Sequence, residues 1–259
     1  MNQHAERQLE ILRKIGVEVW RFRGAETDES PESPGLPESP QVTGRDKAVA
    51  LERQSAPADA GEADVSSVVS ADESLAPIER EVSACRKCEL HQSRTNTVFG
   101  CGSPDADWLL VGEAPGQHED QQGQPFVGRA GKLLDMMIAA LGMKREQVFI
   151  ANVLKCRPPG NRDPLPREIE QCEPYLHRQL ALIRPKVIVA LGRISAQALL
   201  KTGAPLGKLR GRVHRYGADD IPLVATYHPA YLLRSPEQKA KAWEDLWQAK
   251  TIVEQSPPP

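Results

Sequence analysis

Four of the five cysteines are spaced in a way that could hold a metal ion or an iron–sulfur cluster. Cys85 and Cys88 form a CxxC pair, and Cys156 and Cys172 follow with fifteen residues between them. Two thiolates on one turn and two from a distant loop can complete a four-sulfur site. The spacing alone fits zinc and an iron–sulfur cluster equally well. Cys101, which lies between two glycines, fits a small buried side chain instead.

A second candidate site is the loop that follows the apolar run WLLV at residues 108–111. The run stops at GEAPG (residues 112–116), and the loop continues to Gly131 as QHEDQQGQPFVGRAG. Glycines at the carboxyl end of a buried strand let the backbone turn closely around a ligand. In open α/β sheets, ligands bind outside the carboxyl ends of the strands. We therefore interpret residues 106–131 as a ligand-binding loop.

Two polar side chains are associated with other apolar runs. Asn152 interrupts the run VFIANVL (residues 148–154), and a buried amide requires hydrogen-bond partners. His228 precedes Pro229 at the end of a further apolar run, and a histidine there can donate a hydrogen bond to developing negative charge. Both side chains are therefore candidates for contact with a ligand.

The elements that must position these residues alternate between strands and helices. Apolar runs predict strands at residues 108–111, 147–154, 186–191 and 223–226. Helical periodicity predicts helices over residues 74–85, 129–141, 166–183, 195–201 and 236–253. This alternation indicates an α/β fold, with a mostly parallel four-stranded sheet covered by helices on both faces. Three of the strands end in polar loops, which would converge on one edge of the sheet.

The first 72 residues have a different composition. Residues 1–23 predict a small helical element, and residues 24–72 are rich in Pro, Ser, Glu and Ala with little aliphatic content. Such a segment cannot bury enough apolar surface to offset chain entropy, so we expect a disordered linker. The compact domain is expected to span residues 73–255, and the N-terminal helix is a candidate for binding a protein partner.

Charge and hydropathy exclude some classes of protein. The 259 residues carry a net charge of −2, divided into −7 over residues 1–73 and +5 over the remainder. The basic remainder is compatible with phosphate contacts. The sequence has neither a long apolar run typical of a membrane span nor a secretory signal, so we expect a cytoplasmic protein. An odd number of cysteines in such a chain disfavours a disulfide framework.

Together these motifs resemble the family 4 uracil-DNA glycosylases, the iron–sulfur branch of that superfamily. The resemblance rests on GEAPG…ED…GxPFVGxAG, on NxxKCRPPxNR from residue 152, on HPAYLLR from residue 228 and on the four cysteines. These features keep a consistent order over about residues 83–254. The resemblance implies a three-layer α/β/α sandwich and a [4Fe-4S] cluster on Cys85, Cys88, Cys156 and Cys172. It also implies hydrolysis of the bond between uracil and deoxyribose in DNA, by a monomer that associates with the nucleoid when it acts.

The resemblance also implies roles for the residues of the pocket. Phe126 would stack under a uracil flipped out of the helix, and the amide of Asn152 would match N3–H and O4 of uracil but not the reversed polarity of cytosine. His228 would donate to uracil O2 as negative charge accumulates. The backbone of Gly112, Glu113 and Ala114 would offer amides to the base and help to place the attacking water.

The sequence offers no obvious general base. Many glycosylases of the wider superfamily have an aspartate where Ala114 stands in this sequence. Glu113, Asp120 and Asn161 are the candidates to position the water. A uracil that leaves as an anion lessens the need for strong base catalysis, so we expect the loop to position water rather than to deprotonate it.

The last motif would contact the DNA duplex. Tyr231, Leu232, Leu233 and Arg234 would form an intercalating loop, because an apolar wedge can fill the space left by the flipped base. The alternative is an apolar start to the last helix. Candidate phosphate contacts are Arg157, Arg162, Arg210, Arg212 and Arg234.

Two other functions remain open. A protein of the same superfamily could capture uracil-containing DNA without turnover, as in a branch that carries a uracil-capturing histidine in the loop corresponding to LRGRVHRYG. We interpret His214 of this loop as structural, because the GEAPG loop has Ala114 where that branch has Gln. An iron–sulfur redox protein is disfavoured by the absence of close-packed ferredoxin-type cysteine spacing.

Overall fold

The computed structural model describes residues 10, 13–14, 16 and 74–256. The predictions for residues 1–23 and for the linker 24–72 therefore fall outside the described residues, except at those four positions. Residues 74–256 form the domain considered below. Within these residues, no helix combines the length and the apolar character needed to cross a membrane.

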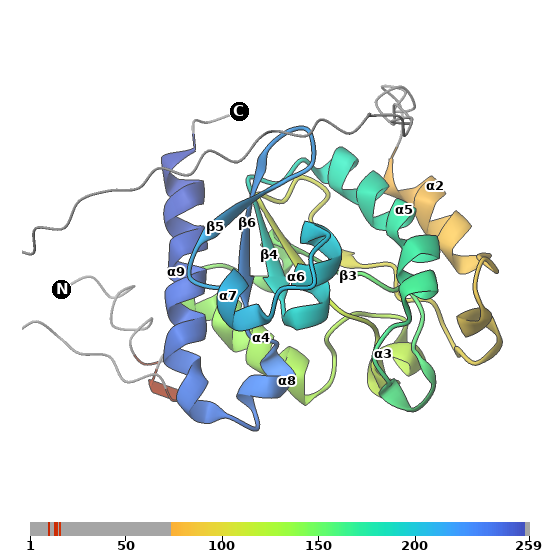
Figure 1. Ribbon diagram of the computed structural model, residues 1–259, viewed down its shortest axis with the longest axis horizontal. Coiled ribbons are helices and arrows are strands. Elements are labelled where there is room, and N and C mark those ends of the chain that lie inside the picture. Colours follow the sequence, from red (N-terminus) through yellow and green to blue (C-terminus); the bar gives the residue numbers. More distant parts are fainter. Residues whose placement is uncertain (1–9, 11–12, 15, 17–73, 257–259) are drawn as a thin grey trace, which may run out of the picture. The chain divides into compact units, whose positions relative to one another are not determined.

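The described part of the chain forms one six-stranded sheet in the order β1-β3-β2-β4-β6-β5 (Figure 1). The four inner strands are parallel to one another, while β1 is antiparallel to β3 and β5 is antiparallel to β6. The strands are β1 (Cys101–Gly102), β2 (Trp108–Gly112), β3 (Phe149–Asn152), β4 (Val187–Leu191), β5 (Val213–Tyr216) and β6 (Ile221–Thr226).

The inner strands are the four predicted from the sequence, so the mostly parallel α/β sheet is confirmed and the number of strands is corrected from four to six. The two additional strands are the edges. The strand β1 is only two residues long, and β5 alternates exposed and half-buried side chains. A short or half-exposed edge strand has no continuous apolar run, which is the signal that revealed the inner strands.

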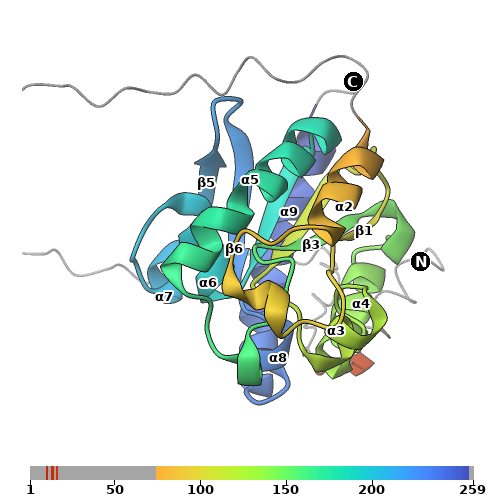
Figure 2. The same ribbon diagram turned by 90° about the vertical axis from the view of Figure 1, so that its right-hand side faces the viewer.

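Helices cover both faces of the sheet, as the three-layer sandwich requires. The α-helices are α2 (Leu75–Ser83), α3 (Gln117–Gln122), α4 (Arg129–Ala140), α5 (Pro166–Ile183), α6 (Arg193–Leu200), α7 (Leu206–Leu209), α8 (Pro229–Leu232) and α9 (Lys239–Gln255). Short 3-10 helices are η2 (Glu89–Gln92), η3 (Arg145–Gln147), η4 (Pro159–Asn161) and η5 (Pro236–Gln238). Figure 2 shows α2 and α5 on the side of the sheet that faces the viewer, with α9 behind it.

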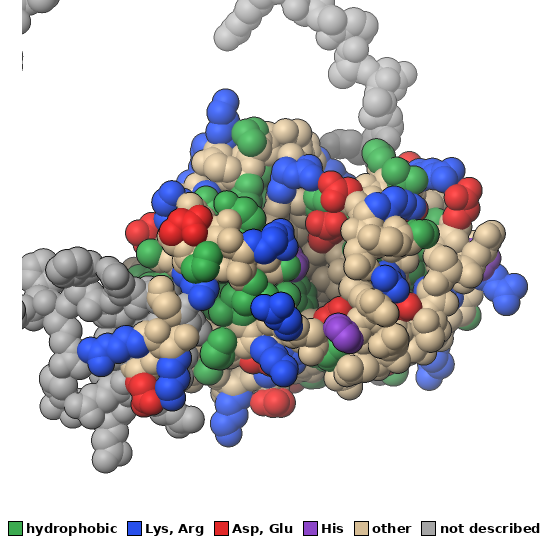
Figure 3. Space-filling model, turned by 90° about the horizontal axis from the view of Figure 1, so that it is seen from below, with side chains coloured by type: hydrophobic (Ala, Val, Ile, Leu, Met, Phe, Trp, Pro, Cys, Tyr) green, Lys and Arg blue, Asp and Glu red, His purple; other side chains and the backbone are tan. Residues whose placement is uncertain are grey.

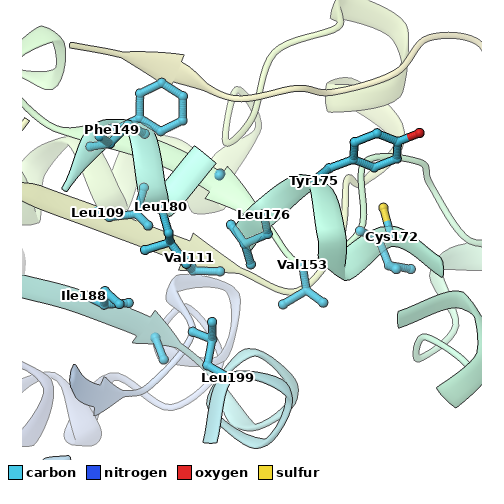
Figure 4. Packing of buried hydrophobic residues seen from close by; sticks show 14 of the residues in the cluster. Leu109, Val111, Phe149, Val153, Cys172, Tyr175, Leu176, Leu180, Ile188 and Leu199 are labelled. Atoms are coloured by element: carbon cyan, nitrogen blue, oxygen red, sulfur yellow. The ribbon is translucent and has the colours of Figure 1, made fainter. Parts of the chain in front are cut away.

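The alternation of side chains along each inner strand creates two cores. On β2, Leu109 and Val111 pack with α2, α5, α6 and α7, while Trp108 and Leu110 pack with α4, α8 and α9. This is the two-residue period of a strand buried on both faces. Figure 4 shows the first core, in which Cys172 lies on the same helix as the packed leucines of α5. The sheet is thus anchored on both sides, and its loops are free to form a site.

Candidate active site

A cavity of about 490 Å³ lies at the carboxyl ends of the parallel strands. Its lining includes nine residues singled out from the sequence, namely Glu113, Ala114, Phe126, Asn152, Asn161, Arg162, His228, Tyr231 and Arg234. Figure 3 views the domain from below and shows a hollow with Lys and Arg side chains around it. The convergence of loops expected from the parallel sheet is therefore present, at the position where α/β sheets bind ligands.

Gly112, the last residue of β2, lets two of these side chains approach the backbone closely. A Cβ atom at Gly112 would lie 2.3 Å from Asn152 Oδ1 and 2.7 Å from Phe126 Cζ. Any larger side chain would therefore displace the amide or the ring. Only glycine therefore fits at position 112 without moving Asn152 or Phe126.

Phe126 is held in an uncommon backbone conformation at the cavity. Its φ is 52°, which non-glycine residues rarely adopt, and its ring stacks on that of His228 with centroids 5.5 Å apart. The following amides of Val127 and Gly128 both donate to Glu119 Oε1, at 2.9 and 3.0 Å. The Glu119 carboxylate thus fixes the turn that presents the aromatic ring.

A second contact holds the other side of the same turn. Arg145 donates to the carbonyl of Pro125 at 2.6 Å and to Asp135 Oδ1 at 2.5 Å. Gly131 in α4 lies so close to the turn that a Cβ there would be 1.8 Å from the Phe126 carbonyl oxygen. The conformation of the turn at Phe126 thus depends on the close approach of Gly112 and Gly131 and on hydrogen bonds to Glu119 and Arg145.

Asn152 ends β3 with its side chain buried, and only 2% of the residue is exposed. Its Oδ1 atom has no hydrogen-bond partner within residues 74–256. A buried polar atom without a partner costs about 1–3 kcal/mol. Within residues 74–256 the protein thus supplies no donor to this atom, although Asn152 lines the cavity.

His228 is the N-cap residue of α8, and its Nδ1 accepts a hydrogen bond from the Ala230 amide at 3.1 Å. Because a backbone amide can only donate, Nδ1 is unprotonated and the ring proton lies on Nε2. Burial, and to a lesser extent the nearby Arg234, lower the pKa of His228 to about 4. The imidazole is therefore a neutral Nε2–H donor at physiological pH.

Glu113 lines the cavity with a carboxyl group that is partly protonated near neutral pH. Burial and the charge of Asp163 raise its pKa to about 7, while Arg193 opposes this shift. Arg193 is ion-paired with Asp163 at 2.8 Å. Near neutral pH, Glu113 can therefore accept a proton as well as a hydrogen bond.

The other two candidates for positioning water are placed differently. Asn161 lines the cavity, and its Oδ1 accepts from Arg157 Nε at 2.7 Å. Asp120 does not line this cavity in the described structure. Its Oδ1 instead accepts hydrogen bonds from the backbone amides of Thr95 (2.8 Å) and Asn96 (3.3 Å). The carboxylate joins α3 to the preceding loop, so the structure does not bring Asp120 to the cavity with Glu113 and Asn161.

The sequence interpretation overlooked Glu119, which lines the cavity and supports Phe126. It lies next to Asp120 in the short helix α3, which was not predicted. Neighbouring helical residues point about 100° apart, so only one of the two carboxylates can face the Phe126 turn. The pair of acids was visible in the sequence, but which acid faces the turn depends on where the helix begins.

The intercalating segment divides into residues with different environments. Tyr231 is exposed and stacks on Tyr227, and Arg234 lines the cavity. Leu233 is 37% exposed, whereas Leu232 is 1% exposed and belongs to the core formed with α4 and α9. The expected wedge role is therefore revised for Leu232, which anchors α8. Tyr231 and Leu232 end the short helix α8, Leu233 and Arg234 follow it, and η5 separates the segment from α9.

Several arginines expected at phosphates also have internal partners. Arg162 forms a two-pronged ion pair with the buried carboxylate of Glu168, at 2.9 and 2.6 Å. Arg210 pairs with the buried Asp245 at 3.0 Å. Arg212 is exposed and donates to a carbonyl in α7. The exposed Arg162 and Arg234 line the cavity and remain the best placed for phosphates.

His214 lies on β5 rather than in the cavity lining. Its Nε2 is 2.7 Å from the carbonyl oxygen of Leu209, so the ring connects the edge strand to α7. This placement agrees with the structural role inferred for His214.

The four spaced cysteines line a second, narrow cavity between α2, η2 and α5. Cys156 Sγ accepts from Arg94 Nη1 at 3.0 Å, and Cys172 Sγ accepts from the amide of Lys155 at 3.2 Å. Burial raises the pKa of Cys172 to about 12, so a bound metal would have to displace its proton. In the described chain, no three His, Cys, Asp or Glu side chains are grouped to hold a single metal ion.

Comparisons with known proteins identify the family of the chain. The profile of the uracil DNA glycosylase superfamily matches residues 99–247. The type-4 uracil-DNA glycosylase of Archaeoglobus fulgidus is 48% identical over 181 residues, which cover 67% of this chain and 90% of the relative. The type-4 enzyme of Sulfurisphaera tokodaii is 50% identical, covering 70% and 86%. That of Thermotoga maritima is 42% identical, covering 68% and 93%. The chain thus belongs to the type-4 uracil-DNA glycosylase family, as its motifs indicated.

Proposed function

We propose that this protein hydrolyses the N-glycosidic bond of deoxyuridine in DNA, releasing free uracil and leaving an abasic site for base-excision repair. The observation that carries this proposal is the buried, unpartnered Oδ1 of Asn152, which lies beside the Phe126 ring at an open cavity. A flat heterocycle that stacks on the ring and donates a hydrogen bond to the amide satisfies both features. Uracil, flipped from the DNA stack, has this combination.

Asn152 can distinguish uracil from cytosine by polarity. Its Oδ1 accepts from uracil N3–H and its amide nitrogen donates to O4, whereas cytosine presents an acceptor at N3 and a donor at C4. A wrong base would leave buried polar groups unpaired, and this loss is the main source of strong discrimination. The fixed positions of Gly112 and Phe126 hold the amide and the base in one arrangement.

His228 stabilises the departing base. As the bond between C1′ and N1 breaks, its electron pair leaves with uracil, and negative charge develops on O2. The neutral Nε2–H donor can hydrogen-bond to this oxygen without giving up its proton, because burial keeps the pKa of the imidazole at about 4. The ring is oriented in advance by the Ala230 amide and by stacking on Phe126.

Water then adds to C1′ from the side of the cavity lined by Glu113 and Asn161. The expectation that this loop only positions water is extended here, because the raised pKa of Glu113, about 7, allows its carboxylate also to accept the water proton near neutral pH. Asn161 is held by Arg157 and can orient the water through hydrogen bonds. Because the sugar becomes cation-like as uracil leaves, orientation of water contributes more than strong deprotonation.

A [4Fe-4S] cluster is our proposal for the group bound by Cys85, Cys88, Cys156 and Cys172. The four residues line one cavity, and the N–H donors of Arg94 and Lys155 at two sulfur atoms suit thiolates of high negative charge. Cys85, Cys88, Cys156 and Cys172 would hold the cluster through their four sulfur atoms. The cluster would supply cross-links between chain segments and no chemical step. We expect the protein to act as a cytoplasmic monomer on uracil-containing DNA.

The test is base release by the purified full chain from an oligonucleotide with one deoxyuridine, with matched thymine and cytosine oligonucleotides as controls. We expect uracil release without added nucleotide. Asn152→Ala and His228→Ala should each lower the single-turnover rate about 100-fold to 1,000-fold. His177→Ala, on the exposed surface of α5, is the matched control and should retain the rate.

Each alternative has its own outcome in this experiment. A stable protein–DNA adduct without free uracil would replace the proposal with a capture function. Cysteine-bound iron with neither uracil release nor an adduct would favour a redox role. Rates that neither substitution changes would overturn the assignment of Asn152 and His228.

A further inference from the structure

The edge of the sheet has a gap next to Asn152. In the described structure, β1 pairs with β3 only at Cys101–Ile150 and Gly102–Phe149. Continuing this antiparallel register would place Phe99 opposite Asn152, but β1 begins at Cys101. A buried backbone carbonyl at the end of β3 therefore lacks the donor that a longer neighbouring strand would supply, and such groups need another partner.

Two buried side chains fill this gap. Lys155 is 1% exposed, and its Nζ donates to the backbone carbonyl of Asn152 at 3.0 Å and to Gln179 Oε1 at 2.6 Å. Gln179 is 0% exposed, and its Nε2 donates to the Phe99 carbonyl at 3.0 Å. The lysine and the glutamine together join the two carbonyls that the register would place opposite each other.

The contact fixes Asn152 from the side opposite to β2. On the β2 side, the amide of Val153 donates to the Gly112 carbonyl at 3.0 Å. On the edge side, the ammonium group of Lys155 binds the Asn152 carbonyl. A charged donor makes a stronger hydrogen bond than a neutral one, and a buried ammonium is tolerated only when acceptors surround it. The backbone that carries the unpartnered Oδ1 is thus held on both sides.

The same lysine also contacts the cysteine cavity. Its backbone amide donates to Cys172 Sγ at 3.2 Å, and its carbonyl accepts from the Val98 amide at 2.8 Å. Asn152, which lines the cavity at the carboxyl ends of the strands, is therefore only three residues away from Lys155, which lines the cysteine cavity. Lys155 thus lines the cysteine cavity and binds the backbone carbonyl of Asn152.

We propose that Lys155, together with Gln179, is a positioning residue that orients Asn152 for recognition of the base. The inference rests on the proposed function, because it assigns Asn152 to uracil. Lys155 touches no substrate atom in this role and acts only through Asn152. Its contribution should therefore disappear when the Asn152 amide is removed.

A double-mutant cycle on the full, cluster-containing protein tests this dependence. Lys155→Met keeps the length of the side chain and removes the donor. In the wild-type background we expect the single-turnover rate of uracil release to fall about 10-fold to 100-fold, since small misplacements of recognition groups have effects of this size. In the Asn152→Ala background, the same substitution should change the rate by less than about 2-fold.

Lys186→Met is the matched control, because Lys186 precedes β4 at the other end of the sheet and pairs with Asp107 at 3.1 Å. It should retain the wild-type rate. If Lys155→Met does not yield folded protein, Gln179→Met, which removes the acceptor of the lysine, takes its place in the cycle. A loss that disappears in the Asn152→Ala background supports the inference.

Equal losses in both backgrounds would show a merely structural role and would overturn the inference while leaving the proposed function intact. An unchanged rate in Lys155→Met would also overturn it. A wild-type protein that releases no uracil would overturn the proposed function and the inference with it. Visible absorbance of the cluster, measured for every variant, separates loss of the cluster from loss of orientation.

Discussion

The cavity lined by cysteines and the cavity at the carboxyl ends of the strands use their polar atoms in opposite ways. In the first, Cys156 and Cys172 receive N–H donors from Arg94 and Lys155. In the second, the Oδ1 atom of Asn152 is buried without a partner among the residues described. Two sulfur atoms of the first region thus have N–H donors from within the protein, whereas the Asn152 oxygen of the second has no donor in residues 74–256.

This difference predicts how each region responds to substitution. Contacts that are complete within the protein contribute to the free energy of unfolding, so their loss should lower stability. Groups kept for a ligand cost stability and contribute to the rate, so their loss should lower the rate while stability is retained. Substitutions in the two regions can therefore be compared directly by measuring both quantities.

The largest effect is expected for Cys156→Ala in the cysteine cavity. Removing one of the four cysteines proposed to hold the cluster should lower the free energy of unfolding by about 3–5 kcal/mol or more. The visible absorbance of the purified protein should fall together with its urea midpoint. The rate per folded molecule, normalised by titration of active sites, should stay near that of wild type.

Cys101→Ala is the control, because Cys101 does not line the cysteine cavity. It should retain the visible absorbance. A Cys156→Ala protein with wild-type stability but a much lower rate per folded molecule would contradict this comparison. It would show that the cysteine cavity contributes to the reaction rather than to stability.

The sequence revealed what depends on continuous patterns. Strands β2 and β4 are uninterrupted apolar runs because both of their faces are buried, and they were predicted almost to the residue. The edge strand β5, which has polar and half-exposed side chains, resembles a loop in the sequence. Interior elements are specified by many similar residues, whereas edges are specified by their neighbours in space.

The composition of the site followed from its motifs, but the direction of each side chain did not. Asn152, Phe126 and His228 meet at one cavity, as expected from their positions after parallel strands. Asp120 faces away, while its neighbour Glu119 supports the Phe126 turn. Direction within a short helix depends on its first residue, which a six-residue helix specifies too weakly for sequence patterns to reveal.

Leu232, the last residue of α8, and Leu233, which follows it, provide the second test, because the first is buried and the second is exposed. Leu232→Ala should lower the free energy of unfolding by about 2–4 kcal/mol, since Leu232 is buried in the core. Leu233→Ala should leave stability within about 0.5 kcal/mol, because Leu233 is exposed.

Rates on paired and single-stranded oligonucleotides complete this test. If Leu233 fills the space left by the flipped base, Leu233→Ala should lower the rate on duplex DNA by about 10-fold, and less on single strands, where no stacked partner opposes flipping. Equal losses on both substrates would exclude a wedge role for Leu233. A stable Leu232→Ala protein would mean that α8 does not need this anchor.

The smallest effect is expected for Glu113→Gln, and its sign follows from the raised pKa. The carboxyl group has a pKa of about 7 in the folded protein and an ordinary value of 4.5. Between these values the folded state binds more protons than the unfolded state, so stability falls as pH rises through this window. Above pH 7 the whole penalty is present. After allowance for solvent screening in the open cavity, it amounts to about 1–2 kcal/mol.

Glu113→Gln should therefore raise the free energy of unfolding at pH 8 and have little effect at pH 4, as measured by urea denaturation. The wild-type rate should rise with pH around 7, because the carboxylate form accepts the water proton, and the variant should lose this rise. Glu146→Gln, an exposed acid in η3, is the control. A variant that is less stable at pH 8 would show that the ionised carboxylate has favourable partners within the protein. Glu113 would then contribute to stability rather than to the reaction.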